Sequence, residues 1–282
     1  MRYVHVDVFS DKPLGGNGLA VAFLDREIDM AELQQITREF NQFETAFVGP
    51  EVAGAFPVRI FTVDEELPFA GHPLLGSAAA IHREFYSQAG RAAIAIALGD
   101  RLVALESVRI SDGMTYSVSM NQGSPDFVAT LDAASALPVA RSLGLDPADL
   151  DPAYPLEVVS TGLPYLLVPL RSGMERARIV LPDFESFLSR FGAKFAYLFD
   201  TATLECRTWD NSGRVEDSAT GSAAGPLAAY LVKNGHARAD APILLSQGRL
   251  TGRPARRDTR LSVGEVCVRL DVAFFAEGKI LV

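Results

Sequence analysis

The sequence predicts an α+β protein of two similar lobes, because one short sequence motif occurs twice, 150 positions apart. In residues 66–80 and again in residues 216–230, an acidic residue precedes a Gly-containing turn, and an Ala- and Leu-rich helical stretch follows. The residue directly after the glycine is polar in both copies, His72 in the first and Ser222 in the second. A helix N-terminus offers unpaired N–H groups and a positive dipole end, so two such ends suggest a small anionic ligand.

In the first half, the pattern of apolar and polar residues predicts several strands and two helices. The strands are expected over residues 4–8, 19–24, 41–48, 57–63, 92–98, 102–105, 108–110 and 116–120. The first helix follows Asp29, which forms a capping-box pattern with Glu32, and continues to Phe40. The second helix begins after His72 and ends near Tyr86.

The second half has a similar order of elements, which supports the duplication. The strands are expected over residues 156–159, 165–169, 195–200, 206–209, 243–246, 260–264 and 266–272. A short helix is expected over 184–191, and a longer one begins at Ser222 and stops at Gly235 after a cationic last turn. Residues 145–155 form a loop rich in Pro and Asp, and residues 274–282 form a tail.

Composition and charge exclude several classes of protein. The 282 residues include 26 basic and 35 acidic side chains, and the net charge of −9 argues against a nucleic-acid partner. No apolar run approaches the roughly 18 residues of a membrane span, and the N-terminus carries no secretory signal pattern. The two cysteines, Cys206 and Cys267, are far apart in the sequence and form no CxxC motif. Such sparse cysteines are typical of proteins in a reducing compartment. We expect a cytoplasmic protein without a nucleic-acid or membrane partner.

The sequence contains no cofactor fingerprint. The glycines of residues 15–18 lack the Lys-Ser/Thr of a Walker loop, and Val21 stands where a dinucleotide fingerprint has its third glycine. We therefore interpret this segment as a structural turn whose amides line the site. No HExxH, no GxSxG and no His/Asp cluster with metal spacing occurs. We expect an enzyme that works by acid–base chemistry, without a metal or other cofactor.

Four side chains are candidates for chemistry, and each has a structural alternative. On a strand, Glu44 shares its face with Ala46 and Val48, and a carboxylate shielded from water suits proton transfer. The alternative is a surface glutamate on an edge strand. His72 lies between a glycine and a proline, which points it from a helix start, and the alternative is a packed or capping histidine.

In the second copy of the motif, residues 216–230, Asp217 and Ser222 lie on either side of the turn. Both residue types are also ordinary helix N-caps, so a plain cap is the alternative to ligand binding. A separate group of arginines follows downstream and comprises Arg249, Arg253, Arg256, Arg257 and Arg260. Such a group could bind an acid, but we interpret it as a solvated hairpin because the chain is acidic overall.

The motifs resemble those of the PhzF family from end to end. The matching segments are residues 7–9, 16–17, 20–23, 44–48, 59–73, 216–223, 247–248 and 252–254. Among them, Gly71-His72-Pro73 and the Glu-Asp-x-Ala-Thr-Gly-Ser-Ala stretch of residues 216–223 are the specific ones. The resemblance implies a homodimer and a small anionic carboxylate as substrate.

The family fold is of the diaminopimelate-epimerase type. It implies two pseudo-symmetric lobes, each a curved, mostly antiparallel sheet wrapped round a central helix, with the active site in the cleft between them. We expect residues 1–122 plus 273–282 in the N-terminal lobe and residues 123–272 in the C-terminal lobe. The epimerase uses two cysteines at its helix starts. This chain has His72 and Ser222 there and no cysteine nearby, so a two-thiol mechanism is excluded.

The resemblance also assigns roles to residues. In the phenazine-biosynthesis member, a glutamate shuttles a proton within dihydro-3-hydroxyanthranilate, and the matching residue is Glu44. By the same resemblance, His72 and Asp217 are catalytic residues that hold the ring substituents, and Ser222 with the amides of its helix start holds the carboxylate. The other residues expected to bind the substrate are Gly71, Gly221, Thr220 and Asn17.

The chain departs from many relatives at two positions, with Gly18 in place of Pro and Phe43 in place of Ser. The substrate is therefore open. The narrow hypothesis is a trans-2,3-dihydro-3-hydroxyanthranilate isomerase that needs no cofactor. The alternatives are an amino-acid epimerase or racemase of unknown substrate and a non-catalytic protein that binds small acids. A nucleotide-dependent enzyme is disfavoured because the phosphate loop is missing.

Overall fold

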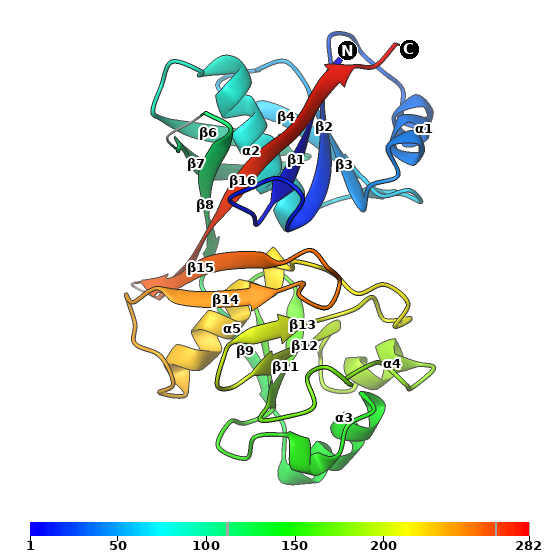
Figure 1. Ribbon diagram of the computed structural model, residues 1–282, viewed down its shortest axis with the longest axis vertical. Coiled ribbons are helices and arrows are strands. Elements are labelled where there is room, and N and C mark those ends of the chain that lie inside the picture. The colour runs from blue at the N-terminus through cyan, green and yellow to red at the C-terminus, as the bar shows by residue number, and fades with distance from the viewer. Residues whose placement is uncertain (111–112, 263, 282) are drawn as a thin grey trace. The chain divides into compact units, whose positions relative to one another are not determined.

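The computed structural model describes residues 1–110, 113–262 and 264–281 (Figure 1). The expected strand over 260–264 and the expected tail over 274–282 include residues 263 and 282, which lie outside this part. The chain divides into two compact units, one of Met1–Asn121 with Arg269–Val282 and the other of Gln122–Val268. Among the helices of the described residues, none is both long enough and apolar enough to cross a membrane.

The first unit contains a closed, mostly antiparallel barrel. Its strands, in spatial order, are β1 (Arg2–Val8), β2 (Asn17–Phe23), β3 (Glu44–Val48), β4 (Phe56–Phe61), β6 (Arg91–Leu98), β7 (Arg101–Arg109), β8 (Thr115–Gly123) and β16 (Glu265–Lys279). The barrel closes because β16 also pairs with β1. Two neighbouring pairs are parallel, β2 with β3 and β4 with β6, and the two-residue strand β5 (Glu66–Leu67) pairs with β4.

The helix α2 (Gly71–Phe85) is the core of this unit and packs against β1, β2, β3, β6 and β7. Every residue from His72 to His82 is buried. Gly76 allows the close packing, because a Cβ there would lie 2.5 Å from Leu19 Cδ2. The helix α1 (Met30–Phe40) covers the other face of the sheet, where Leu33 and Phe47 belong to one apolar cluster. Asp29 caps this helix as predicted, since its side chain accepts from the Glu32 amide.

The second unit wraps a second sheet round α5 (Gly221–Lys233). Its strands, in spatial order, are β16, β15 (Ala255–Ser262), β14 (Ile243–Gln247), β13 (Glu205–Arg207), β12 (Phe195–Asp200), β11 (Pro164–Leu170), β10 (Glu157–Ser160) and β9 (Asp126–Thr130). The helix packs on β10, β11 and β15. On the other side of the sheet, α3 (Ala136–Ser142) and α4 (Phe184–Ser189) complete an apolar cluster that contains Trp209. The α+β class, with a sheet wrapped round a helix in each unit, is thus confirmed.

Several expected boundaries are wrong. The strands expected over 102–105 and 108–110 are one strand, β7, because buried Ser107 bonds to His82 Nδ1 (2.8 Å) and so satisfies a polar residue in the core. The strand expected over 266–272 continues without a break into the expected tail, forming β16. A bulge in its pairing with β1 shifts the alternation there and hides the continuity from a period-2 pattern.

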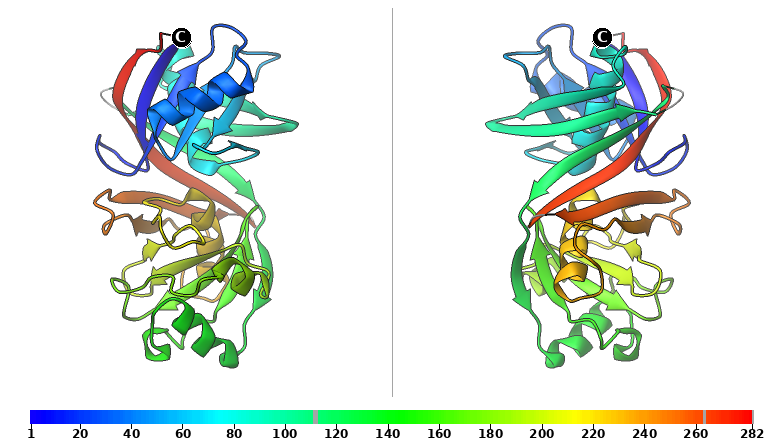
Figure 2. Two further views of the ribbon diagram at one scale, coloured as in Figure 1. Left: turned by 90° about the vertical axis from the view of Figure 1, so that its right-hand side faces the viewer. Right: turned by 90° about the vertical axis from the view of Figure 1, so that its left-hand side faces the viewer.

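Two elements of the second unit were missed by the sequence pattern. The edge strand β9 alternates between exposed and half-buried residues and has little apolar signal. The helix α3 is only seven residues long and has Pro138 within its first turn. The loop over 145–155 does occur, with one short 3₁₀ turn at Pro147–Asp149, and β15 begins at Ala255, five residues before the expected strand. Figure 2 shows the green α3 on the outer surface of the second unit.

Candidate active site

Glu44 is a buried carboxylate inside the first unit, and the alternative of a surface glutamate is wrong. It is the first residue of β3 and is 5% exposed. In the parallel pairing of β2 with β3 its register partner is Leu19, so both side chains lie on one face of the sheet. Leu19 meets α2 at Gly76, and Glu44 therefore points toward the same helix.

His72 contacts this carboxylate directly. It is the second residue of α2 and is 8% exposed, and its Nε2 lies 3.0 Å from Glu44 Oε2. Ala70 is the N-cap and has no side-chain acceptor, so the first-turn amides receive no side-chain cap from it. A buried carboxylate beside an imidazole is an arrangement that can accept, hold and return a proton.

Asn17 and Gly71 belong to β2 and α2, two elements that pair with or pack on β3, the strand of Glu44. Asn17 begins β2, is 9% exposed, and has the same parity as Leu19, so it shares the sheet face that turns to α2. Gly71 is the first residue of α2. Gly16, before Asn17, has a φ of +55°, and a Cβ there would lie 2.0 Å from Val8 O, so this position requires glycine. The turn is structural, as the sequence predicts.

In the second unit, Asp217 organises the turn that leads into α5. Its Oδ2 accepts from the Thr220 hydroxyl (2.6 Å), and its Oδ1 accepts from the Ala219 amide (3.0 Å). The N-cap residue itself is Thr220, whose hydroxyl is therefore directed back to Asp217. Ser222 is the second helical residue, after Gly221, and its Oγ lies 2.7 Å from the Tyr165 hydroxyl. Neither Asp217 nor Ser222 is thus the N-cap of this helix.

Three polar side chains beneath this turn were not among the candidates. They are Tyr197 on β12, Gln247 on β14 and Arg257 on β15, each at most 1% exposed. Burial raises the pKa of Tyr197 well above the ordinary value of a phenol, so its hydroxyl stays protonated. Burial likewise raises the pKa of Tyr165. Gln247 and Arg257 bond directly to the backbone of this turn, so the candidate site includes polar groups beyond the four candidate residues.

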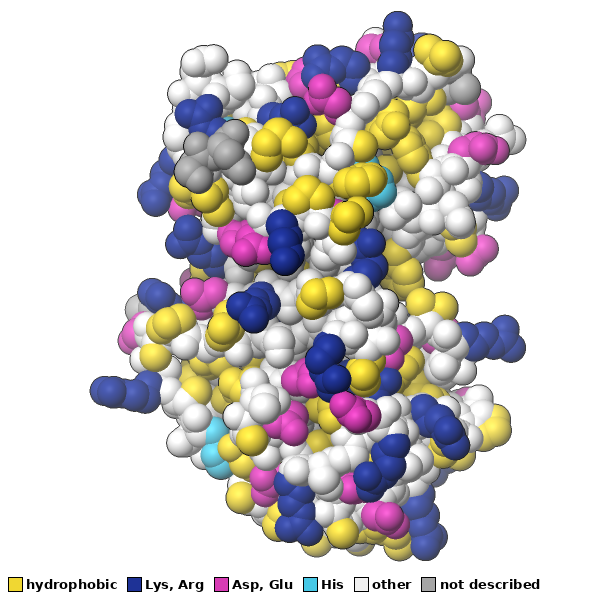
Figure 3. Space-filling view, in the orientation of Figure 1, with side chains coloured by type: hydrophobic (Ala, Val, Ile, Leu, Met, Phe, Trp, Pro, Cys, Tyr) yellow, Lys and Arg dark blue, Asp and Glu magenta, His cyan; other side chains and the backbone are white. Residues whose placement is uncertain are grey.

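The interpretation of the arginine group as a solvated hairpin is wrong for Arg257. This side chain is 1% exposed, whereas its neighbour Arg256 is exposed. The signal was present in the sequence as alternation, because Ala255, Arg257 and Thr259 share one strand face and all three are buried. Basic and acidic side chains are interspersed on the face of the molecule in Figure 3.

Neither cysteine lies in the unit that contains α2, whereas Cys206 packs in the same apolar cluster as Ala223 and Ala224 of α5. Cys206 lies on β13, where burial raises the pKa of its thiol to about 11, and Cys267 lies on β16. Both belong to the second unit by residue number, so the start of α2 has no thiol in its own unit. Among the described residues, no group of three or more His, Cys, Asp and Glu side chains could hold a metal ion.

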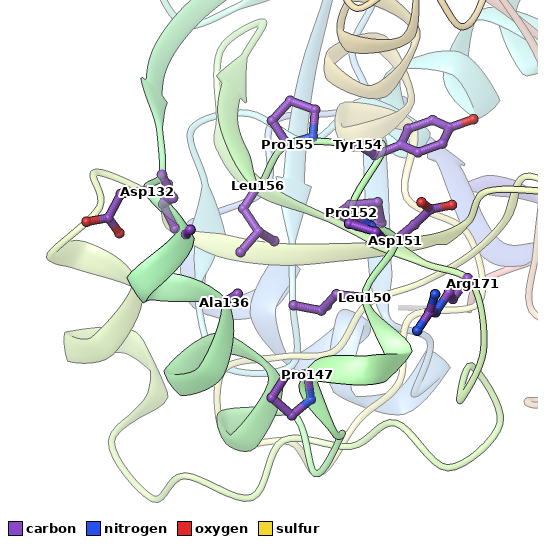
Figure 4. Close-up of a pocket in the computed structure, with 13 residues that line it drawn as sticks. Asp132, Ala136, Pro147, Leu150, Asp151, Pro152, Tyr154, Pro155, Leu156 and Arg171 are labelled. Carbon is purple, nitrogen blue, oxygen red and sulfur yellow. The ribbon is translucent and has the colours of Figure 1, made fainter.

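A separate cavity of about 390 Å³ lies in the second unit, and none of the residues named above lines it (Figure 4). Its centre is apolar, with Ala136, Leu150 and Leu156 facing the space. Asp132 lies at the margin with its carboxylate turned outward. No polar groups converge on the centre in this view, so the cavity does not compete with the helix starts as a catalytic site.

Comparison with known proteins identifies the family. The chain matches the family described as "Phenazine biosynthesis-like protein" (PhzC-PhzF) over residues 6–270. It belongs to the PhzC-PhzF family. The trans-2,3-dihydro-3-hydroxyanthranilate isomerase of Pseudomonas fluorescens is 36% identical over 258 residues, covering 90% of this chain and 88% of that enzyme. This PhzF-family protein is accordingly an isomerase.

Solved structures agree with the fold. A predicted epimerase from Pseudomonas aeruginosa is 45% identical, with a TM-score of 0.91 and coverage of 100% of this chain and 99% of the other. A probable proline racemase from Agrobacterium radiobacter is 12% identical, with a TM-score of 0.64 and coverage of 100% and 93%. The second likeness concerns the fold alone. The PhzF-family protein has the diaminopimelate-epimerase type of fold that its motifs predicted.

Proposed function

We propose that the chain isomerises trans-2,3-dihydro-3-hydroxyanthranilate or a closely similar cyclic amino acid by moving a proton between two ring carbons. The observation that carries the proposal is the buried contact of Glu44 with His72 at the start of α2. The name of the Pseudomonas fluorescens relative, which is 36% identical, supports this substrate. The reaction changes neither the elemental composition nor the overall oxidation state of the substrate, so acid–base groups are sufficient to catalyse it.

In the proposed mechanism, Glu44 is the base and then the acid. Its carboxylate takes a proton from one ring carbon, and the electron pair left behind shifts the double bonds. The resulting carboxylic acid returns the proton to another ring carbon on the same face, which yields an enol that converts to the ketone. One group serves both steps because burial slows exchange of the proton with water.

The other residues are proposed to hold the substrate while the proton moves. His72 and Asp217 bind the ring substituents. Ser222, oriented by Tyr165, binds the carboxylate together with the first-turn amides of α5, since a helix start favours an anion. The remaining residues proposed to line the substrate are Asn17, Gly71, Thr220 and Gly221.

The test is turnover of purified protein with trans-2,3-dihydro-3-hydroxyanthranilate, followed by absorbance and by mass spectrometry of the product. We expect an isomer of unchanged mass in ordinary water. In deuterated water we expect incomplete deuterium at the new C–H position, because the shielded acid returns part of the original hydrogen. A protein that binds the compound without converting it, at enzyme concentrations that give complete conversion by the relative, would overturn the proposal in favour of a binding protein.

A second candidate is an epimerase, and the 45% identical structure of a predicted epimerase favours it. An epimerase inverts one carbon and moves no double bond. The same product analysis separates the two activities. Inversion at a single carbon, with deuterium from solvent on the opposite face, would establish the epimerase.

We further propose a cytoplasmic homodimer that needs no metal or other cofactor. The two free cysteines and the resemblance of the motifs support this proposal. Light scattering after gel filtration should give twice the mass of the 30.4 kDa chain. Turnover should persist after dialysis against a chelator. A monomer, or activity that zinc or magnesium restores, would contradict it.

A further inference from the structure

A buried arginine lies directly behind the start of α5. Arg257 is 1% exposed, and its guanidinium donates to the Thr220 carbonyl (2.8 Å) and to Gln247 Oε1 (2.5 Å). Thr220 is the N-cap of α5, two residues before Ser222. The guanidinium is thus attached to the backbone of the residue at which the helix begins.

Gln247 connects this arginine to the preceding turn. Its Nε2 donates to the Asp217 carbonyl (2.7 Å) and to the Thr220 hydroxyl (3.1 Å). Its Oε1 accepts from the Thr220 amide (3.3 Å), from the Tyr197 hydroxyl (3.1 Å) and from Arg257. One buried side chain therefore bonds both ends of the 217–220 turn, and Arg257 orients that side chain.

The network has an electrostatic consequence as well as a geometric one. A helix start already carries a partial positive charge, and a guanidinium behind it adds to the potential that an anion meets there. Within low-dielectric surroundings such a charge is screened weakly. Asp217 places a carboxylate in the same turn, and the buried guanidinium offsets that negative charge where a second carboxylate would bind.

We propose that Arg257 is a positioning residue for the substrate carboxylate. It acts through the Thr220 carbonyl and the Gln247 amide, which hold the 217–220 turn and therefore the first-turn amides and Ser222 in a geometry that binds an anion. This inference rests on the proposed function only in taking the start of α5 as the carboxylate site. Arg257 itself does not touch the substrate.

The test compares two ligands that differ by one carboxylate, 3-hydroxyanthranilate and 2-aminophenol. Calorimetric titration is performed with wild type, Arg257→Met and Arg256→Met, the last being a matched control because Arg256 is the exposed neighbour on the same strand. We expect Arg257→Met to weaken the acid by about tenfold or more, the scale of a hydrogen-bonded charge, and to change 2-aminophenol less than twofold. Arg256→Met should change neither, and Arg257→Lys should restore part of the affinity.

A second measurement does not depend on any ligand. Amide hydrogen exchange of residues 217–222 should be faster in Arg257→Met than in wild type and unchanged in Arg256→Met. Should Arg257→Met fail to fold, Gln247→Glu takes its place, because it removes both amide donors to the turn. Equal losses for both ligands, or unchanged exchange in this segment, would overturn the inference. Failure of the proposed function would instead appear as wild type that does not convert the dihydro substrate.

Discussion

The starts of α2 and α5 are built alike and differ in chemistry. Each helix begins at a glycine, has a polar second residue, and carries another glycine close to its sheet. In the first unit the second residue is His72, which contacts the carboxylate of Glu44 at 3.0 Å. In the second unit it is Ser222, which contacts the Tyr165 hydroxyl at 2.7 Å.

Among the described residues, a buried guanidinium lies behind one helix start and not behind the other. Glu44 brings a carboxylate to the start of α2, and Arg257 brings a guanidinium to the start of α5. The helix-on-sheet arrangement of both units thus needs glycine where the helix meets the sheet. The side chains that face the helix start can differ between the units. We interpret the first start as the one for proton transfer and the second as the one for anion binding.

The largest effect should follow from Glu44→Gln. The amide keeps the shape of the side chain but cannot take a proton, so turnover should fall at least ~10²-fold. Binding of 3-hydroxyanthranilate should change little, because the carboxylate is assigned to the other helix start. Steady-state kinetics and calorimetry measure the two quantities, with exposed Glu27→Gln as the control. Turnover near that of wild type would remove Glu44 from the mechanism.

The close packing of both helices can be tested with Gly76→Ala and Gly225→Ala. The added methyl would meet Leu19 Cδ2 at 2.5 Å in the first case and Gln122 Oε1 at 2.1 Å in the second. We expect each to lower the free energy of unfolding by about 1–3 kcal/mol, partly offset by the better helix propensity of alanine. Urea unfolding followed by circular dichroism measures this.

Gly90→Ala serves as the control for both variants, because a Cβ there meets nothing within 4 Å. The fluorescence of Trp209, the only tryptophan of the chain, reports on the second unit. Gly225→Ala should therefore shift the fluorescence transition. If both helix variants are as stable as the Gly90 variant, the packing argument fails for both units.

Alkaline pH should destabilise the second unit more than the first. Burial raises the pKa of the Cys206 thiol from its ordinary value of 9.0 to about 11, so the native state retains a proton that the unfolded chain releases. The stabilisation is complete below pH 9 and is lost as pH rises toward 11, by roughly 1 kcal/mol per pH unit. Burial also raises the pKa values of Tyr165, Tyr197 and Tyr230 in this unit, and that of Tyr116 in the first.

The measurement is urea unfolding between pH 8 and 11, followed by the fluorescence of Trp209. Cys206→Ala should show a shallower decline of stability over this range than wild type, because the group that releases the proton is gone. Identical slopes for the two proteins would mean that the thiol does not contribute to the pH dependence.

The smallest effect is expected for Tyr165→Phe. Loss of the hydroxyl leaves Ser222 without the contact at 2.7 Å, and a single hydrogen bond of about 0.5–1.5 kcal/mol corresponds to a rise in KM of up to about tenfold. The kcat should stay within about twofold, since the base is elsewhere. Tyr154→Phe, on the loop before β10, is the control. A fall in kcat with unchanged KM would assign Tyr165 to the chemical step instead.

Local sequence by itself determined where the main helices begin. Asp29 and Glu32 predicted the start of α1, and the glycines at 71 and 221 predicted the starts of α2 and α5. These signals are local because capping and backbone freedom act within a few residues. The alternation of apolar residues identified most strands. The motifs around these glycines also identified the family, and with it the fold.

Tertiary structure alone decided which side chains meet at each helix start. The contact of Glu44 with His72 depends on the parallel pairing of β2 with β3 and on the packing of α2, neither of which a local pattern specifies. Arg257 is buried because Thr220 and Gln247, 37 and 10 residues away, supply its acceptors. A charged side chain can enter a core only where distant segments satisfy its hydrogen bonds, and the arrangement of those segments exists only in the folded chain.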